Sequence, residues 1–301
     1  MAAGDVTLTA QTRATAAQSR VGRRVVDMIY YAALIAMAAI FAFPFFWTVS
    51  SSLKEPSELY TFPPQMLPAV PRWENYATVL LNPRVPFLTW VGNSLFVVIL
   101  STAGIVITAS MAGYAFARFD FRGKNLIFLA TLGTLMLPSQ VTLIPQYVLF
   151  HKLGWINTLN PLWVPFWFGG GAFSIFLMRQ FIMTLPKELD ESAVIDGAGY
   201  ARIFWNILLP LCKPALATVA VIAMIARWND YLEPLIYLSS KEKFTVAVGL
   251  TFYRDNPEQG GVPTQHLLMA GSVMTILPVI ALFFVAQRYF VQGIALSGLK
   301  G

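Results

Sequence analysis

The chain has few of the residues from which soluble enzymes build reactive sites. It contains one cysteine, Cys212, and two histidines, His151 and His266, in 301 residues. A lone cysteine forms no intramolecular disulfide, and without a histidine nearby in the sequence it offers no Cys/His metal site. Charged residues make up only 12% of the chain, about half of the fraction in soluble domains. We therefore expect no disulfide framework, no bound metal and no cofactor.

Motifs for catalysis and nucleotide binding are missing as well. The sequence has no G-x-x-x-x-G-K-[ST] phosphate-binding loop, no H-E-x-x-H and no G-x-S-x-G. The run Gly169-Gly170-Gly171 lies in an apolar segment without the lysine that a phosphate cradle requires. We assign these glycines to close helix packing or to a bend. The sequence thus predicts that the chain is not an enzyme and does not hydrolyse ATP itself.

Apolar sequence, in contrast, is abundant. Hydrophobic residues make up 56% of the chain, and the mean hydropathy is +0.61. A helix crosses the bilayer core with about 20 predominantly apolar residues. The sequence therefore predicts an all-α, polytopic membrane protein with six transmembrane helices, at 26–47, 90–116, 125–143, 161–178, 214–238 and 267–286.

The distribution of basic residues predicts how these spans are oriented. Six spans place both termini on one side, and the segments on that side hold 13 Lys and Arg residues in 82 positions, against 7 in 93 on the other. Because Lys and Arg concentrate in cytoplasmic segments, we expect both termini to be cytoplasmic. Residues 1–24, rich in Ala and Thr, are expected to form a disordered tail. The membrane domain would then comprise 25–301, with a C-terminal cytoplasmic tail at 288–301.

The cytoplasmic loop at 179–213 has the pattern of two short helices joined at an angle. Pro186 suits the first turn of a helix, and the acidic residues that follow favour the positive end of the helix dipole. We expect one helix over 186–196, stopped by Gly197 and Gly199 in left-handed conformations. A second helix over 200–209 would end against Pro210.

Helical spacing gives this loop one acidic and one apolar face. Glu188 and Glu191 are three residues apart, and Leu189 and Ala193 are four apart. Small residues from Ser192 to Gly197 would let the backbone of a partner approach closely, and the larger apolar residues of the second helix would add contact area. The loop is therefore interpreted as a docking surface for a soluble protein. An amphipathic loop lying on the membrane surface is the alternative.

Several motifs together resemble one family. They are Glu191 followed by two small residues and Gly197, then Ile207-Leu208-Leu209-Pro210, together with Asn93-Ser94, Tyr114 to Arg118, Leu137-Pro138 and Trp228-Asn229-Asp230. In order and spacing they resemble the maltose-type carbohydrate permeases of bacterial ABC importers, the inner-membrane components of binding-protein-dependent transport. Ser192 is a departure within the loop motif, and Arg227 stands where the family tends to have a small or hydroxylated residue.

This resemblance implies a multi-pass subunit of a prokaryotic inner (plasma) membrane and a set of partners. The partners are a second permease subunit in a heterodimer, two cytosolic ABC ATPase subunits and an extracytoplasmic solute-binding protein. The loop at 179–213 would be the coupling loop, whose angled helices contact the ATPase, and the C-terminal tail would add contacts through Gln292, Ser297 and Lys300. The implied coupling residues in the loop are Glu188, Glu191, Ser192, Ala193, Asp196, Gly197, Tyr200, Phe204, Ile207, Leu209 and Pro210.

Polar residues inside the predicted spans point to a solute pathway, because each is costly in lipid. Aromatic faces, amides and carboxylates suit a polyhydroxylated solute, and we assign six such residues to the pathway: Asn93, Arg227, Trp228, Asn229, Asp230 and Tyr231. Arg227 and Asp230 are three residues apart, so an ion pair between them is the alternative to ligand binding.

The expected substrate is a carbohydrate, either a sugar or an oligosaccharide. An unpaired Arg227 would instead favour an anionic solute such as a glycerol-phosphodiester, and another polyol is also compatible with these residues. A stand-alone secondary transporter is the alternative outside this class. Few ionisable residues lie within the spans to relay ions, so we place ATP-driven import first.

Overall fold

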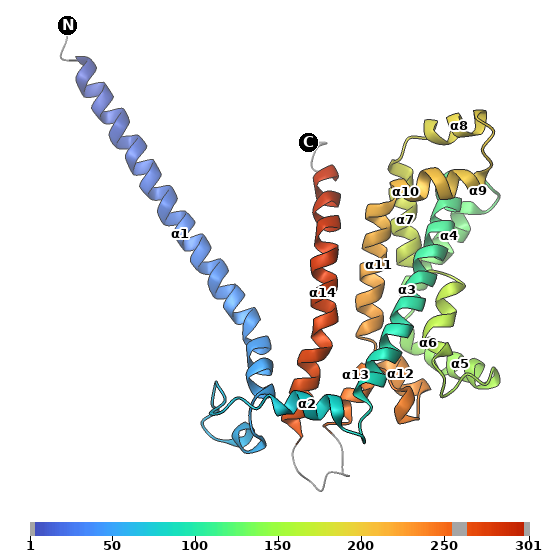
Figure 1. The fold of residues 1–301 in the computed structure, drawn as a ribbon. Helices are drawn as coiled ribbons and strands as arrows, with labels where there is room; N and C mark the ends of the chain where they lie inside the picture. The colour runs from blue at the N-terminus through green and yellow to red at the C-terminus, as the bar shows by residue number, and fades with distance from the viewer. Residues whose placement is uncertain (1–3, 255–263, 298–301) are drawn as a thin grey trace.

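The computed structural model describes residues 4–254 and 264–297, and long helices dominate it (Figure 1). By length and composition, four helical segments are able to cross a membrane: Val26–Ser52, Phe87–Arg118, Asn160–Thr184 and Gln265–Val285. Two bent helix pairs raise the number to six if each pair is one span. The long helices are α1 (Gly4–Ser52), α3 (Phe87–Arg118), α4 (Lys124–Gly133), α5 (Ser139–Lys152), α7 (Ala172–Thr184), α11 (Lys213–Trp228) and α14 (Gln265–Ser297).

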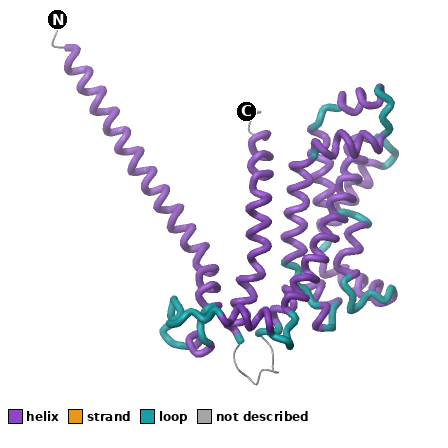
Figure 2. Tube along the Cα trace, viewed as in Figure 1, coloured by secondary structure: helices purple, strands orange, loops and turns teal. Residues whose placement is uncertain are grey.

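Short helices connect these segments, and the described residues contain no β-strand (Figure 2). The predicted all-α, polytopic fold is therefore confirmed. The short α-helices are α2 (Glu74–Leu81), α6 (Asn160–Trp163), α8 (Glu188–Ile195), α9 (Tyr200–Arg202), α10 (Leu209–Leu211), α12 (Leu232–Tyr237) and α13 (Val246–Thr251). The 3₁₀ turns are η1 (Pro56–Tyr60), η2 (Thr134–Met136), η3 (Val164–Trp167) and η5 (Lys241–Lys243), and η4 (Ile203–Leu208) is a π-helical turn.

Helix α3 lies at the centre of the bundle, packed chiefly against α7 and α11. Gly170 permits a close contact between the segment before α7 and α3, in agreement with the close packing predicted for residues 169–171. A Cβ atom on Gly170 would lie 2.6 Å from the backbone nitrogen of Ala109 and from the carbonyl oxygen of Ile105. Any larger residue would push this segment away from α3, so the glycine sets the distance between α3 and the start of α7.

Two of the predicted spans are broken rather than straight. The third was predicted at 125–143, but the helix turns by 99° between Met136 and Ser139. Pro138 explains the turn, because a proline moves the preceding residue out of the helical region, and Leu137 has φ −82° and ψ 118°. The fifth was predicted at 214–238, but α11 ends at Trp228. In a continuous helix, the ring of Pro234 would clash with the carbonyl of Asp230, four residues earlier. The helix therefore does not continue through Asp230.

Different elements lie at the two ends of the helix bundle. The described N-terminal end of α1, the described C-terminal end of α14 and the α8 loop all lie at one end, and α2, α12 and α13 lie at the other (Figure 1). Helix α1 diverges from the bundle and contacts α14. It begins at Gly4, whereas we predicted a disordered tail over 1–24. That tail has many good helix formers and no proline, so its local sequence is compatible with a helix.

Candidate coupling loop and translocation pathway

Helix α8 ends in a glycine motif that fixes the angle of the loop. Gly197 has φ 79°, the left-handed conformation that favours glycine. Its N–H donates to the Val194 carbonyl at 3.0 Å, and the N–H of Ala198 donates to the Ala193 carbonyl at 2.9 Å. These two bonds form a Schellman cap. The prediction for Gly197 is therefore confirmed, but that for Gly199 is wrong, because Gly199 is extended with φ −74° and ψ 160°.

The second helical stretch of the loop is longer than we predicted. It runs from Tyr200 to Leu211 through the π-helical turn, and then bends by 78° into α11. Pro210 does not stop it. The proline lies just after the π-helical turn, and such a turn locally replaces the i→i−4 hydrogen-bond ladder that a proline would interrupt.

The outward side of α8 combines acidic and apolar groups. Glu188, Glu191, Ser192, Asp196 and Gly197 are exposed, as docking residues must be. Beyond the predicted set, the side chains of Val194 and Ile195 are 51% and 86% exposed. Helical spacing assigned the apolar face to Leu189 and Ala193 and thus overlooked these two, which lie off that face. Large apolar groups at the tip of an acidic helix are suited to contact with another protein.

Other predicted coupling residues anchor the loop to its own bundle. Ala193 and Phe204 are buried, so they are not available to a partner. Ile207 and Leu209 are partly buried and pack on the same core. Tyr200 and Pro210 are exposed. The loop residues predicted for docking thus divide into an outward group and an anchoring group, because the second stretch turns one side toward α3 and α11.

Arg118, the last residue of α3, ties the loop to the bundle. Its Nε lies 2.6 Å from Oδ2 of Asp190, and its side chain is only 6% exposed. Its Nη2 donates to the carbonyls of Leu185 at 3.0 Å and Pro186 at 3.3 Å, where α7 gives way to the loop. Burial raises the pKa of the Asp190 carboxyl above its ordinary value, and the Arg118 charge opposes that rise. Both residues were missing from the predicted site, since they are far apart in the sequence.

Aromatic contacts reinforce this connection. Tyr114 stacks on Phe204 with ring centroids 5.2 Å apart, and Phe119 meets Tyr200 edge to face at 5.1 Å. The Tyr114 hydroxyl also donates to the Tyr200 carbonyl at 3.4 Å. Tyr114, Phe119 and Tyr200 also border a cavity of about 480 Å³, together with Arg118 and residues of α8. The C-terminal end of α3 therefore contacts both helical stretches of the loop.

The C-terminal tail is described only in part. Gln292 and Ser297 lie in α14, which continues to Ser297, but the described side chains end before them. Lys300 lies outside the described residues. The predicted tail contacts therefore stay predictions.

In the predicted pathway, Arg227 is paired. Its Nη1 donates to Oδ2 of Asp230 and to Oε2 of Glu233, each at 3.1 Å. The guanidinium also lies over the ring of Phe166, 4.6 Å from the centroid. The ion-pair alternative is thus the arrangement in the structure, with Glu233 as a second partner that we did not predict. Its signal was present in the sequence, because an acidic residue inside a predicted span is itself unusual.

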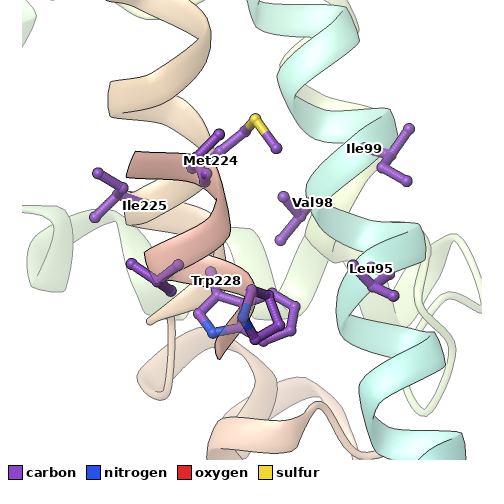
Figure 3. Close-up of a pocket in the computed structure, with 9 residues that line it drawn as sticks. Leu95, Val98, Ile99, Met224, Ile225 and Trp228 are labelled. Atoms are coloured by element: carbon purple, nitrogen blue, oxygen red, sulfur yellow. The ribbon is translucent and has the colours of Figure 1, made fainter. Parts of the chain in front are cut away.

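Trp228 points into helix packing rather than into a polar space. It is buried, and its Nε1 donates to the Thr275 carbonyl of α14 at 3.2 Å. Figure 3 shows Met224, Ile225 and Trp228 from α11 across from Leu95, Val98 and Ile99 of α3, around a cavity of about 170 Å³. With these apolar walls, the cavity offers little for the hydroxyl groups of a solute.

Asn93 makes structural hydrogen bonds, and its role in the pathway stays a prediction. Its Nδ2 donates to the carbonyls of Glu242 and Phe244, each at 2.9 Å, and so holds the segment after α12 against α3. Asn229 is exposed, and its Nδ2 bonds to the Ile225 carbonyl of its own helix at 2.8 Å. Tyr231 is exposed beside it. The structure thus joins Arg227 and Asp230 in an ion pair, whereas Asn93 and Trp228 donate to backbone carbonyls of other segments.

Comparisons with known proteins agree with this architecture. Residues 104–296 match the family described as "Binding-protein-dependent transport system inner membrane component". The arabinooligosaccharides transport system permease protein AraQ of Bacillus subtilis is 35% identical over 88% of this chain and 92% of its own length. The sn-glycerol-3-phosphate transport system permease protein UgpE of Yersinia enterocolitica is 32% identical over 90% of this chain and 97% of its own.

A solved structure shows the same fold. It is a bacterial ABC transporter involved in the import of the acidic polysaccharide alginate, and one of its chains superposes with a TM-score of 0.79 at 26% identity. The match covers 89% of this chain and 97% of that one. The family match spans more than half of the sequence, and two relatives align over most of it. The chain therefore belongs to the binding-protein-dependent transport system inner membrane components, the membrane-spanning permease subunits of ABC importers.

Proposed function

We propose that this subunit forms half of the translocation pathway for a carbohydrate, and that α8 couples the pathway to a cytosolic ATPase. The observation that carries the coupling role is the arrangement of α8, which presents exposed acidic and apolar groups while Arg118 fixes its base to α3. A force applied to the outward side of α8 would therefore reach a membrane-spanning helix directly.

The charge of α8 favours a protein partner over the membrane surface. Helices that lie on bilayers carry Lys and Arg on their polar side, which matches the negative potential of the cytoplasmic leaflet. Helix α8 has three acidic residues in its first turn, Glu188, Asp190 and Glu191, and no basic residue. A basic groove on an ATPase would complement this helix, with Glu191 as one ion-pair partner.

The remaining partners follow from the size of the chain. Up to six spans in one subunit supply half of a pathway, so a second permease subunit completes it, and we propose a heterodimer. Two ATPase subunits and an extracytoplasmic solute-binding protein complete the importer. The excess of basic residues on one side supports a cytoplasmic location for both termini and α8, in the inner membrane of a prokaryote. ATP would act by binding more tightly to one of two states, inward- or outward-facing.

A carbohydrate is the substrate class that the relatives favour first. AraQ is named for arabinooligosaccharides and UgpE for sn-glycerol-3-phosphate, so an importer of glycerol-phosphodiesters or other polyols is the second candidate. The pairing of Arg227 with Asp230 favours the carbohydrate, since a paired guanidinium has less capacity for a phosphate. Family membership favours ATP-driven import over a stand-alone secondary transporter.

A pull-down from native membranes tests the coupling role. The tagged chain is solubilised in mild detergent, and the proteins that co-purify are identified for wild type, Glu191→Ala and Glu74→Ala. Glu74 is an exposed acidic residue of α2, at the opposite end of the bundle, so it is the matched control. We expect an ATPase and a second permease with wild type and control. Glu191→Ala should keep the permease and lose ATPase.

Two outcomes would contradict the proposal. Equal recovery of the ATPase with Glu191→Ala and wild type would remove Glu191 from the docking surface. Recovery of the wild-type chain alone, under conditions that keep other membrane complexes intact, would remove the multisubunit importer. Uptake measured in control samples that lack ATP would then identify the driving force.

A further inference from the structure

We propose that a cavity between α5, η3 and α12 is a contact site for a neutral, polyhydroxylated solute, with Glu233, Gln146 and Tyr237 as its hydrogen-bonding residues. This inference rests on the proposed import function and names a site for it. None of the three residues is in the pathway predicted from the sequence. The cavity has a volume of about 320 Å³, at the small end of ligand sites, and suits one sugar ring better than a whole oligosaccharide.

The position of the cavity is the first argument. Two of its lining residues, Glu233 and Tyr237, belong to α12, the short helix that follows the interruption after α11. The others come from α5, α6 and η3. An interrupted helix leaves backbone polar groups and helix ends free, and such backbone is tolerated where it is buried in protein or lines a watery cavity. Secondary transporters use interrupted helices of this kind to contact their solutes, and we extend that principle to this importer subunit.

The chemistry of the lining is the second argument. Glu233 supplies a carboxylate, Gln146 an amide and Tyr237 a hydroxyl, and the Tyr237 hydroxyl bonds to Oε1 of Gln146 at 3.4 Å. Paired donors and acceptors of this kind match the hydroxyl groups of a sugar. Phe150 also lines the cavity and meets the ring of Tyr237 edge to face, with centroids 5.3 Å apart. Aromatic rings beside polar groups offer apolar faces for the C–H side of a sugar ring.

The charges around the cavity are the third argument, and they favour a neutral solute. Of its eight lining residues, Glu233 alone is charged. Arg227 is the neighbouring cation, but Asp230 and Glu233 both accept from its Nη1, and its planar face lies over Phe166, another lining residue. A phosphate group requires cations or donors that are not already engaged. This site has more acidic than basic groups, so it would repel sn-glycerol 3-phosphate.

Uptake by the assembled importer tests the inference. The complex that co-purifies with the chain is reconstituted in liposomes, and uptake of arabinotriose, maltose, trehalose and sn-glycerol 3-phosphate is measured. The variants are Glu233→Gln, Gln146→Ala and Tyr237→Phe, and Glu74→Gln on α2 is the matched control. We expect wild type and control to import a neutral saccharide and to leave the phosphate outside. Glu233→Gln should lower saccharide uptake roughly 10- to 100-fold, because a hydrogen bond to a charged group is lost.

Assembly and import are scored separately, so that the outcomes are distinct. If Glu233→Gln no longer co-purifies with its partners, Tyr237→Phe decides, since it removes one hydroxyl and should still lower uptake several-fold. Wild-type uptake by all three variants would overturn the contact site and leave the proposed function intact. Preferential import of sn-glycerol 3-phosphate by wild type would overturn the neutral solute alone. Failure of wild type to import any probe with ATP would overturn the proposed carbohydrate import and, with it, this inference.

Discussion

Two arginines lie in the last turns of two long helices, and both are held by carboxylates, yet their surroundings differ. Arg118 ends α3, where it binds Asp190 and two backbone carbonyls. Arg227 lies near the end of α11 and binds the side chains of Asp230 and Glu233. A cation is favourable at either place, because it meets the negative end of the helix dipole. The two arginines differ in their hydrogen-bond acceptors. Arg118 bonds to backbone carbonyls as well as to a carboxylate, whereas Arg227 bonds to side chains.

That difference separates a mechanical connection from a binding surface. Because Arg118 bonds to backbone where the loop begins, α8 and α3 cannot move apart without breaking several polar contacts. Arg227 leaves the backbone of its neighbours unconstrained, and its side chain is 18% exposed against 6% for Arg118. Its acidic partner Glu233 borders a cavity. We infer that the first arginine transmits motion and the second sets the charge of a solute site.

The largest effect should come from Arg118→Ala. It leaves Asp190 buried without its cation, and breaking a buried pair in this way costs about 3–5 kcal/mol. We expect a lower thermal unfolding midpoint in detergent, faster proteolysis of the 179–213 loop and ATP hydrolysis that no longer drives uptake. Arg122→Ala, at an exposed cation near the same end of α3, is the control. Unchanged loop proteolysis and an unchanged ratio of uptake to hydrolysis would refute the connection.

Arg227→Ala should have a smaller effect on stability, because the Arg227 side chain is 18% exposed, against 6% for Arg118. We expect a loss of about 2 kcal/mol, the value of a hydrogen bond between charged groups, together with reduced uptake. Adding Asp230→Ala should restore part of the stability, since it removes one of the carboxylates left unpaired. The double-mutant cycle in chemical unfolding measures this coupling. Additive effects of the two substitutions would show that the pair is not formed.

Gly197→Val and Gly199→Ala form a matched pair in the loop. Gly197 has φ 79°, where a side chain costs about 1–2 kcal/mol, whereas Gly199 has φ −74° and accepts alanine without strain. We expect Gly197→Val to misdirect α8 and weaken ATPase recovery, with Gly199→Ala close to wild type. Equal recovery of the ATPase with both variants would mean that the angle of α8 does not matter.

The smallest effect on folding should come from Ile195→Ala. The side chain is 86% exposed, and exposed substitutions change unfolding free energies by about 0.5 kcal/mol or less. Docking should nevertheless weaken several-fold, because the apolar tip is lost to the partner. Leu81→Ala, exposed to a similar degree on α2, is the control. If ATPase affinity, measured by titration of the solubilised chain, is the same for both variants, the tip does not contribute.

The sequence predicted what local chemistry determines. The six apolar segments, the helix at α8 and the left-handed Gly197 all depend on residues within a few positions of one another. The breaks could also have been anticipated, since Pro138 and Pro234 lie inside the predicted third and fifth spans. Apolar length alone does not reveal them, because both prolines lie within predominantly apolar segments. Proline inside an apolar segment is a signal of interruption that hydropathy does not record.

The contacts of the predicted site residues could not be derived from the sequence, because their partners are distant in the chain. Asn93 bonds to carbonyls about 150 positions away, and no local pattern indicates that its amide is engaged. Arg118 and Asp190 likewise meet only after α3 and the loop are packed. Trp228 was predicted to offer an aromatic face to a sugar, but the direction of its ring depends on the position of α14. Types of residue could be predicted, but their partners could not.

Cross-linking at α8 tests the central claim most directly. In a Cys212→Ala background, which removes the one native cysteine, Ile195→Cys is compared with Leu81→Cys in native membranes. A thiol-to-amine cross-linker with a short spacer is applied with and without ATP, and the attached proteins are identified. We predict that Ile195→Cys attaches to a cytosolic ATPase in an ATP-dependent yield and that Leu81→Cys does not. A cross-link to the ATPase from neither position, or equally from both, would contradict the account.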